Sequence, residues 1–298
     1  MGHPAIRNRV VKRVLALLAA CLALVPAPVQ AWGYYAHRTT AEIALANIRP
    51  ETRAGLERLL KAAPALGVEG CDLASLEDAA TWPDCLRKDY WRWGYTFAWH
   101  YRTAPVCEAY DPRANCSGQN CILAQIERNE RILADESLPA NVRLEALAFL
   151  VHFIGDVHMP LHSGDKDDRG GNDREVDYGI VPDLNLHWIW DGPLAERAIT
   201  EQAGIVRRYS PAERAELTGG TPADWGRESW EAAREIVYAR AFDRDPCAGE
   251  LPEHGALTQE DIAASAPVNR RRIQQAGLRI ADLLESAFAP GPLPEPAS

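Results

Sequence analysis

The sequence lacks an excess of positive charge, and it has only one long hydrophobic run. Its 298 residues carry 32 Lys and Arg against 42 Asp and Glu, a formal net charge of −10 at pH 7. This acidity argues against broad electrostatic capture of duplex nucleic acid, which needs a basic surface. It does not exclude an enzyme that acts on nucleic acid, because a bound metal cluster can supply positive charge locally. Internal repeats and obvious linkers are also absent.

Paired Cys-x-x-Cys spacing, typical of zinc ribbons, is missing as well. Six cysteines follow the N-terminal leader, at positions 71, 85, 107, 116, 121 and 247. An even number of cysteines in an exported chain favours disulfides over thiolate metal ligands. Spacing alone allows about 15 pairings. We predict one of them, the local pair Cys116–Cys121 around Gly118.

Residues 1–31 have the pattern of a signal peptide. Four basic residues between positions 7 and 13 precede the apolar run Val14–Val25, and Val29 and Ala31 match a small-residue cleavage site. An uncleaved anchor is the alternative, but about 12 apolar residues are too few to cross a bilayer. We therefore expect cleavage after Ala31 and export to the periplasm or the medium, with no stable membrane association. Losing the leader takes the net charge from −10 to about −14.

Apolar periodicity predicts an all-α fold, with residues 32–289 forming one mainly helical domain. The expected helices cover residues 40–48, 51–60, 123–133, 139–157, 223–241 and 268–288, with another beginning near residue 185. A short strand pair is expected at 175–180, inside an otherwise loop-like stretch. Residues 290–298 are Pro-rich and are predicted to be disordered. The single domain and the acidic charge favour a monomer.

Histidine and aspartate recur at helical spacing in two places. His152 precedes Asp156 by four residues, and His187 precedes Asp191 by four, so each pair shares one helix face. His162 follows the first pair just after Pro160. One such pair is more often a helix ion pair than a metal site. Two pairs with a fifth ligand favour zinc, which accepts imidazole and carboxylate.

Cleavage after Ala31 would make Trp32 the first residue of the mature chain. Its free α-amine, with an ordinary pKa near about 8, can lose a proton to a metal. The amine and the Trp32 carbonyl oxygen can then form a chelate, with His37 close by. The simpler interpretation is a buried tryptophan followed by a capping histidine.

These motifs together resemble the S1/P1-type nucleases, which are zinc-dependent single-strand nucleases and 3′-nucleotidases related to bacterial zinc phospholipase C. The resemblance extends from Trp32 to about Phe288. The most specific parts are Trp32-Gly33 with His37, the run from Phe149 to Asp156, and Pro160-Leu161-His162, completed by Gly170-Gly171-Asn172 and by Asn185-Leu186-His187 with Asp191.

The resemblance implies a disulfide-stabilised helical domain that holds three zinc ions. One ion would use Asp84, His100, His152 and Asp156. A second would use His162, His187 and Asp191. The third would use the Trp32 amine and carbonyl with His37, sharing Asp156. Asp78 is a rival to Asp84, which the Trp-x-Asp context favours.

The resemblance also implies the reaction, in which water activated by the zinc pair attacks phosphorus in single-stranded DNA or RNA and leaves 5′-phosphates. 3′-Nucleotides would be further substrates. Arg87 would neutralise charge in the transition state, Asn172 would contact the substrate or orient its loop, and Tyr101 would stack a base. Fungal members carry Asp where this chain has Thr103, which removes that position's water-orienting carboxylate.

Two alternatives differ in class from the nuclease. Zinc phospholipase C uses a similar cluster, but the short Trp32–His37 spacing, Asp191 in place of Glu, and Gly170-Gly171-Asn172 favour the nuclease branch. A non-catalytic, zinc-binding secreted protein is the other alternative. Nothing in the sequence indicates that the open coordination position needed for catalysis is lost.

Overall fold

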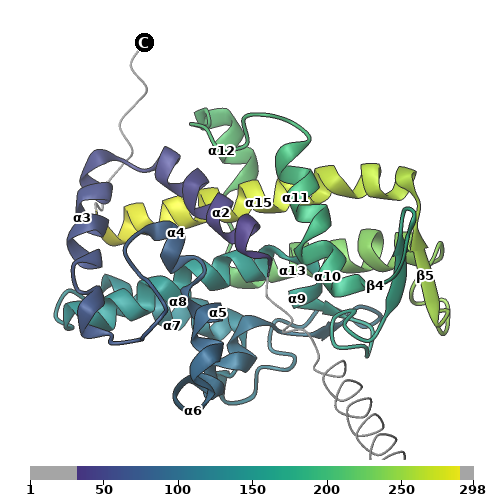
Figure 1. Cartoon of the computed structure of the whole chain (residues 1–298), viewed down its shortest axis with the longest axis horizontal. Coiled ribbons are helices and arrows are strands. Elements are labelled where there is room, and N and C mark those ends of the chain that lie inside the picture. The colour runs from purple at the N-terminus through teal and green to yellow at the C-terminus, as the bar shows by residue number, and fades with distance from the viewer. Residues whose placement is uncertain (1–31, 289–298) are drawn as a thin grey trace, which may run out of the picture. The chain divides into compact units, whose positions relative to one another are not determined.

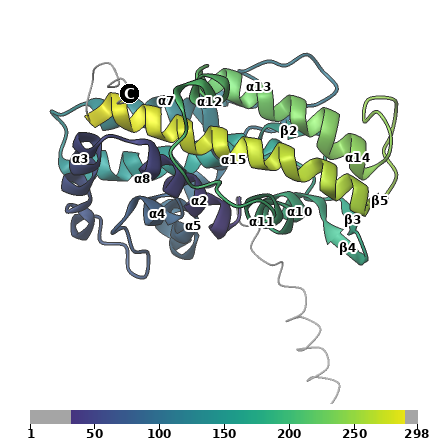
Figure 2. The ribbon, with the colours of Figure 1, turned by 90° about the horizontal axis from the view of Figure 1, so that it is seen from above.

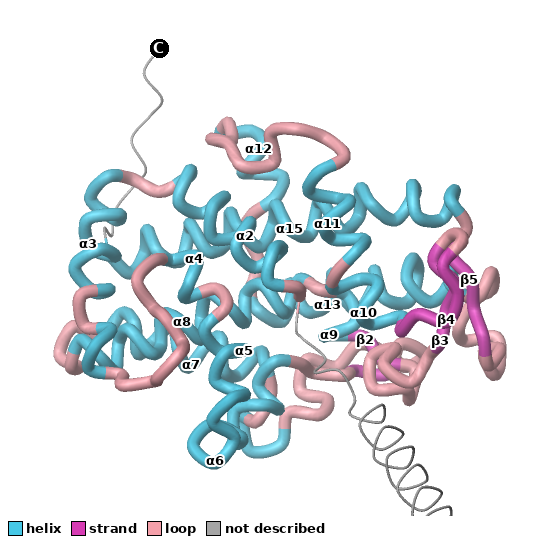
Figure 3. The backbone as a smooth tube through the Cα atoms, in the orientation of Figure 1, coloured by secondary structure: helices cyan, strands magenta, loops and turns pink. Residues whose placement is uncertain are grey.

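The computed structural model describes residues 32–288, and this part of the chain is mainly helical (Figures 1 and 3). The helices are α2 (Tyr34–Asn47), α3 (Pro50–Leu60), α4 (Leu76–Ala79), α5 (Trp82–Cys85), α6 (Tyr90–Trp93), α7 (Ile122–Ala134), α8 (Ala140–His158), α9 (Pro160–Ser163), α10 (Leu186–Asp191), α11 (Pro193–Thr200), α12 (Pro211–Leu217), α13 (Pro222–Ala232), α14 (Ala239–Ala241) and α15 (Gln259–Phe288). The predicted leader and tail lie outside the described residues. Within residues 32–288 no helix is both long enough and apolar enough to cross a membrane.

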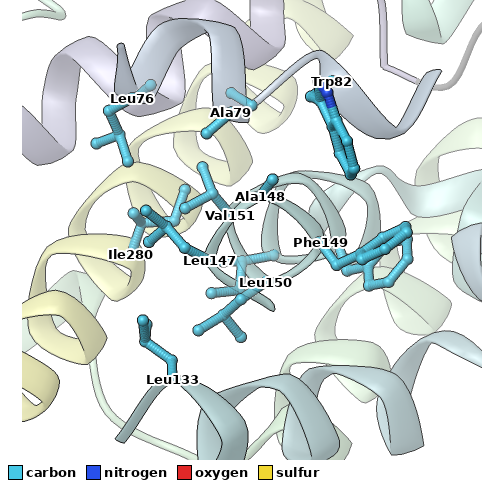
Figure 4. Packing of buried hydrophobic residues seen from close by; sticks show 14 of the residues in the cluster. Leu76, Ala79, Trp82, Leu133, Leu147, Ala148, Phe149, Leu150, Val151 and Ile280 are labelled. Carbon is cyan, nitrogen blue, oxygen red and sulfur yellow. The ribbon is translucent and has the colours of Figure 1, made fainter. Parts of the chain in front are cut away.

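Helix α8 runs through the middle of the fold and is buried over most of its length. The segment from Ala146 to His158 is buried without a break, so the C-terminal half of this helix has no solvent-exposed face. Leu147 and Val151 pack among side chains of α4 and α15, while Phe149 faces Trp82 (Figure 4). A helix buried on every side can carry charged groups only if they are paired. Its polar residues are therefore candidates for function.

The longest helix, α15, lies across α2 and α11 and also contacts α8 (Figure 2). It begins at Gln259, nine residues earlier than predicted, and continues through Pro267. The prediction starts the helix only after this proline, because proline inside a helix removes one backbone hydrogen bond. A capping box formed by Thr258 and Asp261 marks the start of the helix. The Thr258 hydroxyl accepts from the Asp261 amide at 3.1 Å, and the Thr258 amide donates to the Asp261 carboxylate at 3.0 Å.

The strands are short and gather at one end of the helical bundle (Figure 3). A pair joins β1 (Ala104–Pro105) to β2 (Gly164–Asp165), and a second sheet has the order β4 (Val181–Asn185), β3 (Glu175–Tyr178), β5 (His254–Leu257). The sequence predicts a strand pair within residues 175–180; the observed hairpin β3–β4 begins there, but its second strand lies beyond the predicted range. His254 begins β5, which pairs parallel to β3.

Two close approaches hold helix α2 in place. A Cβ on Gly155 of α8 would lie 2.6 Å from Nδ1 of His37, and a Cβ on Gly277 of α15 would lie 2.6 Å from Ile43. Both contacts are shorter than any side chain tolerates. Glycine at these two positions lets α8 and α15 approach α2 from different sides, and it brings His37 next to the polar end of α8.

Three disulfides join distant and local segments. Cys116–Cys121 confirms the predicted local pair, and the other bonds are Cys71–Cys85 and Cys107–Cys247. The last of these closes a loop with a sequence separation of 140 residues. Such a long closure limits the freedom of the unfolded chain more than a short one does.

Candidate metal centre

The predicted ligands converge at the C-terminal half of α8. The donor atoms form three groups, and within each group they lie within 4.8 Å of one another: His37, His152 and Asp156; Asp84, His100 and His152; and His162, His187 and Asp191. Every predicted histidine and aspartate ligand belongs to at least one group. Asp78, the rival to Asp84, instead pairs with Arg38 at 3.3 Å and accepts from the Ala74 amide at 3.0 Å.

Donor spacing in the group of Asp84, His100 and His152 fits a small tetrahedral ion. Nε2 of His152 lies 2.9 Å from Nδ1 of His100, and Oδ1 of Asp84 lies 3.9 Å from each of these nitrogens. Zinc–ligand bonds of about 2.0–2.1 Å in a tetrahedron put neighbouring donors roughly 3.3 Å apart. The observed separations lie on either side of this value. In the group of His162, His187 and Asp191, the distance of 3.1 Å between Nε2 of His187 and Oδ2 of Asp191 is also close to it.

Backbone carbonyls determine which nitrogen three of the histidines present. Nδ1 of His152 lies 2.7 Å from the Ala80 oxygen, Nδ1 of His162 lies 2.8 Å from the His100 oxygen, and Nδ1 of His187 lies 2.7 Å from the Gly170 oxygen. A carbonyl oxygen can only accept, so each Nδ1 must carry the hydrogen. In the neutral imidazole, which is the form that binds a metal, Nε2 is then the nitrogen with the free lone pair, an arrangement that commonly orients metal ligands.

Several buried polar atoms of the cluster have no hydrogen-bond partner. They are Nδ1 of His37, Nε2 of His100, Oδ1 of Asp84 and both carboxylate oxygens of Asp191. Unpaired buried groups of this kind are rare, because each costs about 1–3 kcal/mol. Their concentration at one place is what a metal-binding site looks like without its ions, so the residues fit zinc.

Charge in the cluster favours the ionised form of Asp156. Burial alone would raise the pKa of Asp156, but the imidazoles of His152 and His162 hold that pKa well below its ordinary value. Oδ2 of Asp156 lies 3.0 Å from both His100 and His152, and Oδ1 lies 3.1 Å from His37. Asp156 therefore faces two donor groups at once, as a bridging carboxylate must.

Trp32 lies beside the group of His37, His152 and Asp156. Its side chain is fully buried, and its ring centroid is 6.4 Å from that of His37 in an edge-on contact. The next amide, from Gly33, donates to the Asp191 carbonyl oxygen at 2.9 Å. The backbone of Trp32 is thus held between residues of two donor groups, although its assignment as a ligand stays a prediction.

The residues predicted to contact substrate surround the cluster. Arg87 pairs with Asp84 at 3.2 Å. Tyr101 is 45% exposed and directly follows His100. The Asn172 amide nitrogen donates to the Arg169 carbonyl at 2.9 Å, while its buried Oδ1 has no hydrogen-bond partner. Thr103 follows at the edge of this region, before β1.

Sequence reasoning did not identify the support behind the Gly170-Gly171 loop. Asp168 is buried, and its carboxylate accepts from the Gly171 amide at 2.8 Å, from Nε of Arg174 at 2.9 Å and from the Tyr238 hydroxyl at 2.6 Å. Tyr238 ends a π-helical turn, Ala233–Tyr238, that follows α13. Such turns often mark functional sites, but nothing in the sequence signals this one.

His158, two residues after Asp156, points away from the cluster. Its Nδ1 donates to the Ile154 carbonyl at 2.6 Å, and its Nε2 lies 2.7 Å from Arg279. Burial, with the neighbouring cations of Arg272 and Arg279, keeps its pKa well below the ordinary value. His158 is therefore neutral, and it supports the end of α8 from the side opposite the metal groups.

Comparison with known proteins gives one consistent result. Residues 32–289 match the model of the S1/P1 nuclease family. The chain is 29% identical to nuclease S1 of Aspergillus oryzae over 92% of this chain and 97% of that protein. It is 29% identical to endonuclease 4 of Arabidopsis thaliana over 88% and 90% of the two chains, and 31% identical to nuclease P1 of Penicillium citrinum over 56% and 60%. The chain therefore belongs to the S1/P1 nuclease family, and it is a hydrolase acting on the phosphoester bonds of nucleic acids.

Proposed function

We propose that residues 32–289, freed by cleavage after Ala31, form an exported three-zinc enzyme that cuts single-stranded DNA and RNA and also removes phosphate from 3′-nucleotides. The observation that carries the metal assignment is the cluster of unpaired donors, with three histidines held so that Nε2 points inward. Zinc ions bound there would lower the pKa of a water towards about 7 and neutralise charge on the phosphate.

The surrounding residues supply orientation and charge. The Arg87 guanidinium, next to Asp84, is placed to neutralise charge that develops on the phosphate. The unpaired Oδ1 of Asn172 can accept a hydrogen bond from the sugar or base. A half-exposed ring at Tyr101 offers a face for an unpaired base, which a duplex would not release without unstacking. These features support single-stranded substrates and products ending in 5′-phosphates.

The test is a parallel assay of the zinc-loaded mature protein on single-stranded DNA, duplex DNA, RNA, 3′-AMP and phosphatidylcholine. We expect cleavage of the two single strands and of 3′-AMP, with slow cleavage of the duplex. A variant with Asp191→Asn should lose activity, whereas Asp177→Asn, an exposed carboxylate 2.8 Å from His254, should keep it. Hydrolysis of the lipid alone would overturn the proposal. Zinc binding without turnover of any substrate would instead favour a zinc-binding protein.

A further inference from the structure

One segment between two residues of the metal centre is unusually aromatic. From Asp84 to Tyr101, seven of 18 residues are Phe, Trp or Tyr, whereas aromatic residues make up 8% of the whole chain. The segment contains the end of α5, the whole of α6 and a 3₁₀ stretch, Gly94–His100. Because Asp84 and His100 belong to one donor group, its two ends are held at the metal centre. The turn between them carries α6 to the lower edge of the fold in Figure 1.

Two of these aromatic side chains project into solvent at α6. Trp91 is 97% exposed and Tyr90 is 62% exposed. Other rings of the segment, such as Trp93, are buried and contribute to the core. A tryptophan with almost its whole surface in water contributes little to folding, so its position is better explained by binding.

Continuous contacts link Trp91 to the metal centre. The Trp91 ring centroid lies 6.5 Å from that of Tyr90, which lies 5.5 Å from Phe97. The Arg87 guanidinium carbon lies 5.7 Å from the Phe97 ring, and Arg87 in turn pairs with Asp84 at 3.2 Å. The exposed rings are therefore connected through Phe97 to Arg87, the residue proposed to contact the scissile phosphate.

The charge of this surface suits a polyanion. Lys88 and Arg92 are exposed beside the two rings, with Asp89 as the only acidic residue between Arg87 and Tyr101. The Lys88 ammonium lies 3.4 Å from the Gly70 carbonyl, and a guanidinium nitrogen of Arg92 lies 3.3 Å from the Leu66 carbonyl. Neither contact neutralises the cation. On a chain with a net charge of −10, this local excess of positive charge favours an anionic ligand.

We propose that Tyr90 and Trp91, with Lys88 and Arg92, form a second binding site for the same single strand, beyond the nucleotides at the scissile phosphate. This inference rests on the proposed function. Aromatic rings interleaved with cations bind single strands by stacking bases and neutralising phosphates, with little preference for sequence. The site would make the enzyme favour oligonucleotides over dinucleotides, because only a longer strand can reach both the metal centre and Trp91.

The test compares a 12-nucleotide single strand with a dinucleotide. For Trp91→Ala, the ratio of the KM for the 12-mer to the KM for the dinucleotide should rise about tenfold, the loss expected for one stacked base. Trp91→Phe, which keeps an aromatic ring, should leave this KM ratio close to that of the wild type. Lys88→Gln should weaken the salt dependence of 12-mer binding. The matched control is Ile180→Ala, an equally exposed apolar residue (95%) beside β4, which should leave the ratio unchanged.

Failure of this inference is distinct from failure of the proposed function. An unchanged ratio in Trp91→Ala, with both substrates cleaved, would overturn the second site and leave the nuclease assignment intact. An equal loss of activity on the 12-mer and the dinucleotide would also overturn the second site, because it would place Trp91 at the scissile phosphate. If the wild-type protein cleaved neither substrate, the second site could still be tested by measuring the binding of a phosphorothioate 12-mer with fluorescence anisotropy. Equal binding by wild type and Trp91→Ala would overturn the second site.

Discussion

Asp156 is the residue on which the donor groups depend most. Its Oδ1 lies 3.1 Å from His37 of its own group, and its Oδ2 lies 3.0 Å from His152 and also from His100 of a second group, whereas Asp191 contacts histidines of one group. Asp156→Asn should therefore remove about two of three zinc ions, and Asp191→Asn about one. Zinc content measured by mass spectrometry after dialysis checks this. Asp177→Asn, which breaks an exposed Asp–His pair, is the control and should keep all the zinc. Equal losses in the Asp156 and Asp191 variants would contradict the shared role of Asp156.

The residues of the cluster could largely be predicted from sequence, because helical spacing puts His152 with Asp156 and His187 with Asp191 on common faces. The meeting of Asp84 and His100 with those helices was inferred only from resemblance. No local pattern indicates that a residue 68 positions before His152 lies 3.9 Å from it. The carbonyls of Ala80 and Gly170 could not be predicted at all, because main-chain acceptors leave no mark on the sequence.

At the scale of elements, the π-helical turn after α13 affects a metal ligand through one loop. In this turn the Tyr238 hydroxyl donates a hydrogen bond to the Asp168 carboxylate. The same carboxylate accepts from the Gly171 amide, and the neighbouring Gly170 carbonyl accepts from Nδ1 of His187. Tyr238→Phe removes one hydrogen bond and keeps the ring. We expect zinc affinity of the His162, His187 and Asp191 group to fall about tenfold, the lower end for such supporting residues. Competition with a chromogenic chelator measures it.

The control for this variant is Tyr209→Phe. Tyr209 is also buried, and its hydroxyl donates to the Ile205 carbonyl at 2.8 Å, but it contacts no residue of the donor groups. Both variants should lose similar thermal stability when free of metal. A matching fall in zinc affinity in Tyr209→Phe would show that the effect on Tyr238→Phe reflects general stability.

Sequence analysis placed most long elements correctly, with errors where tertiary contacts decide. Helices α7 and α8 begin and end within one residue of the predicted bounds. In α15 the tertiary contacts with α2 and α11 outweigh the hydrogen bond lost at Pro267. The π turn in the predicted helix 223–241 and the strand β5 at His254 both depend on distant partners, which local periodicity does not contain.

At the scale of the whole molecule, buried neutral histidines make the metal-free protein sensitive to acid. Burial lowers the pKa of His162 to about 4, from about 6.5 when unfolded. Below pH 6.5 the unfolded chain binds a proton that the folded chain rejects, so stability falls as the pH drops from 6.5 towards 4. For His162 this amounts to about 3 kcal/mol. Urea unfolding of the metal-free protein across this range measures the loss, and a flat profile would contradict it.

Removing the metal should destabilise the whole fold. The three donor groups join segments from His37 to Asp191, so ions bound only by the folded state add to its stability. A chelator should therefore lower the melting temperature by more than about 4 °C, the upper end of the shift that 1 kcal/mol causes in a domain of roughly 150–250 residues. Differential scanning calorimetry with and without added zinc checks this. The disulfides should be left oxidised, so that only the metal differs between samples.

An N-terminal extension should act on the centre directly. A mature protein that retains Ala31 before Trp32 has no free amine at Trp32, and we expect it to lose one zinc ion and most of its activity. The control removes residues 290–298 instead. Three bound zinc ions and full activity in the extended protein would show that the Trp32 amine is not a ligand.

The tight fit of helix α2 between Gly155 and Gly277 would make the proposed cleavage after Ala31 an activation step. A helix in such close contact on two sides resists displacement, so we expect that α2 would not shift to accommodate an additional residue before Trp32. The precursor inside the producing cell would then be a zymogen that lacks one zinc ion, and export would switch it on. Its own transcripts, which are single-stranded, would thereby be spared until the enzyme has left the compartment that contains them.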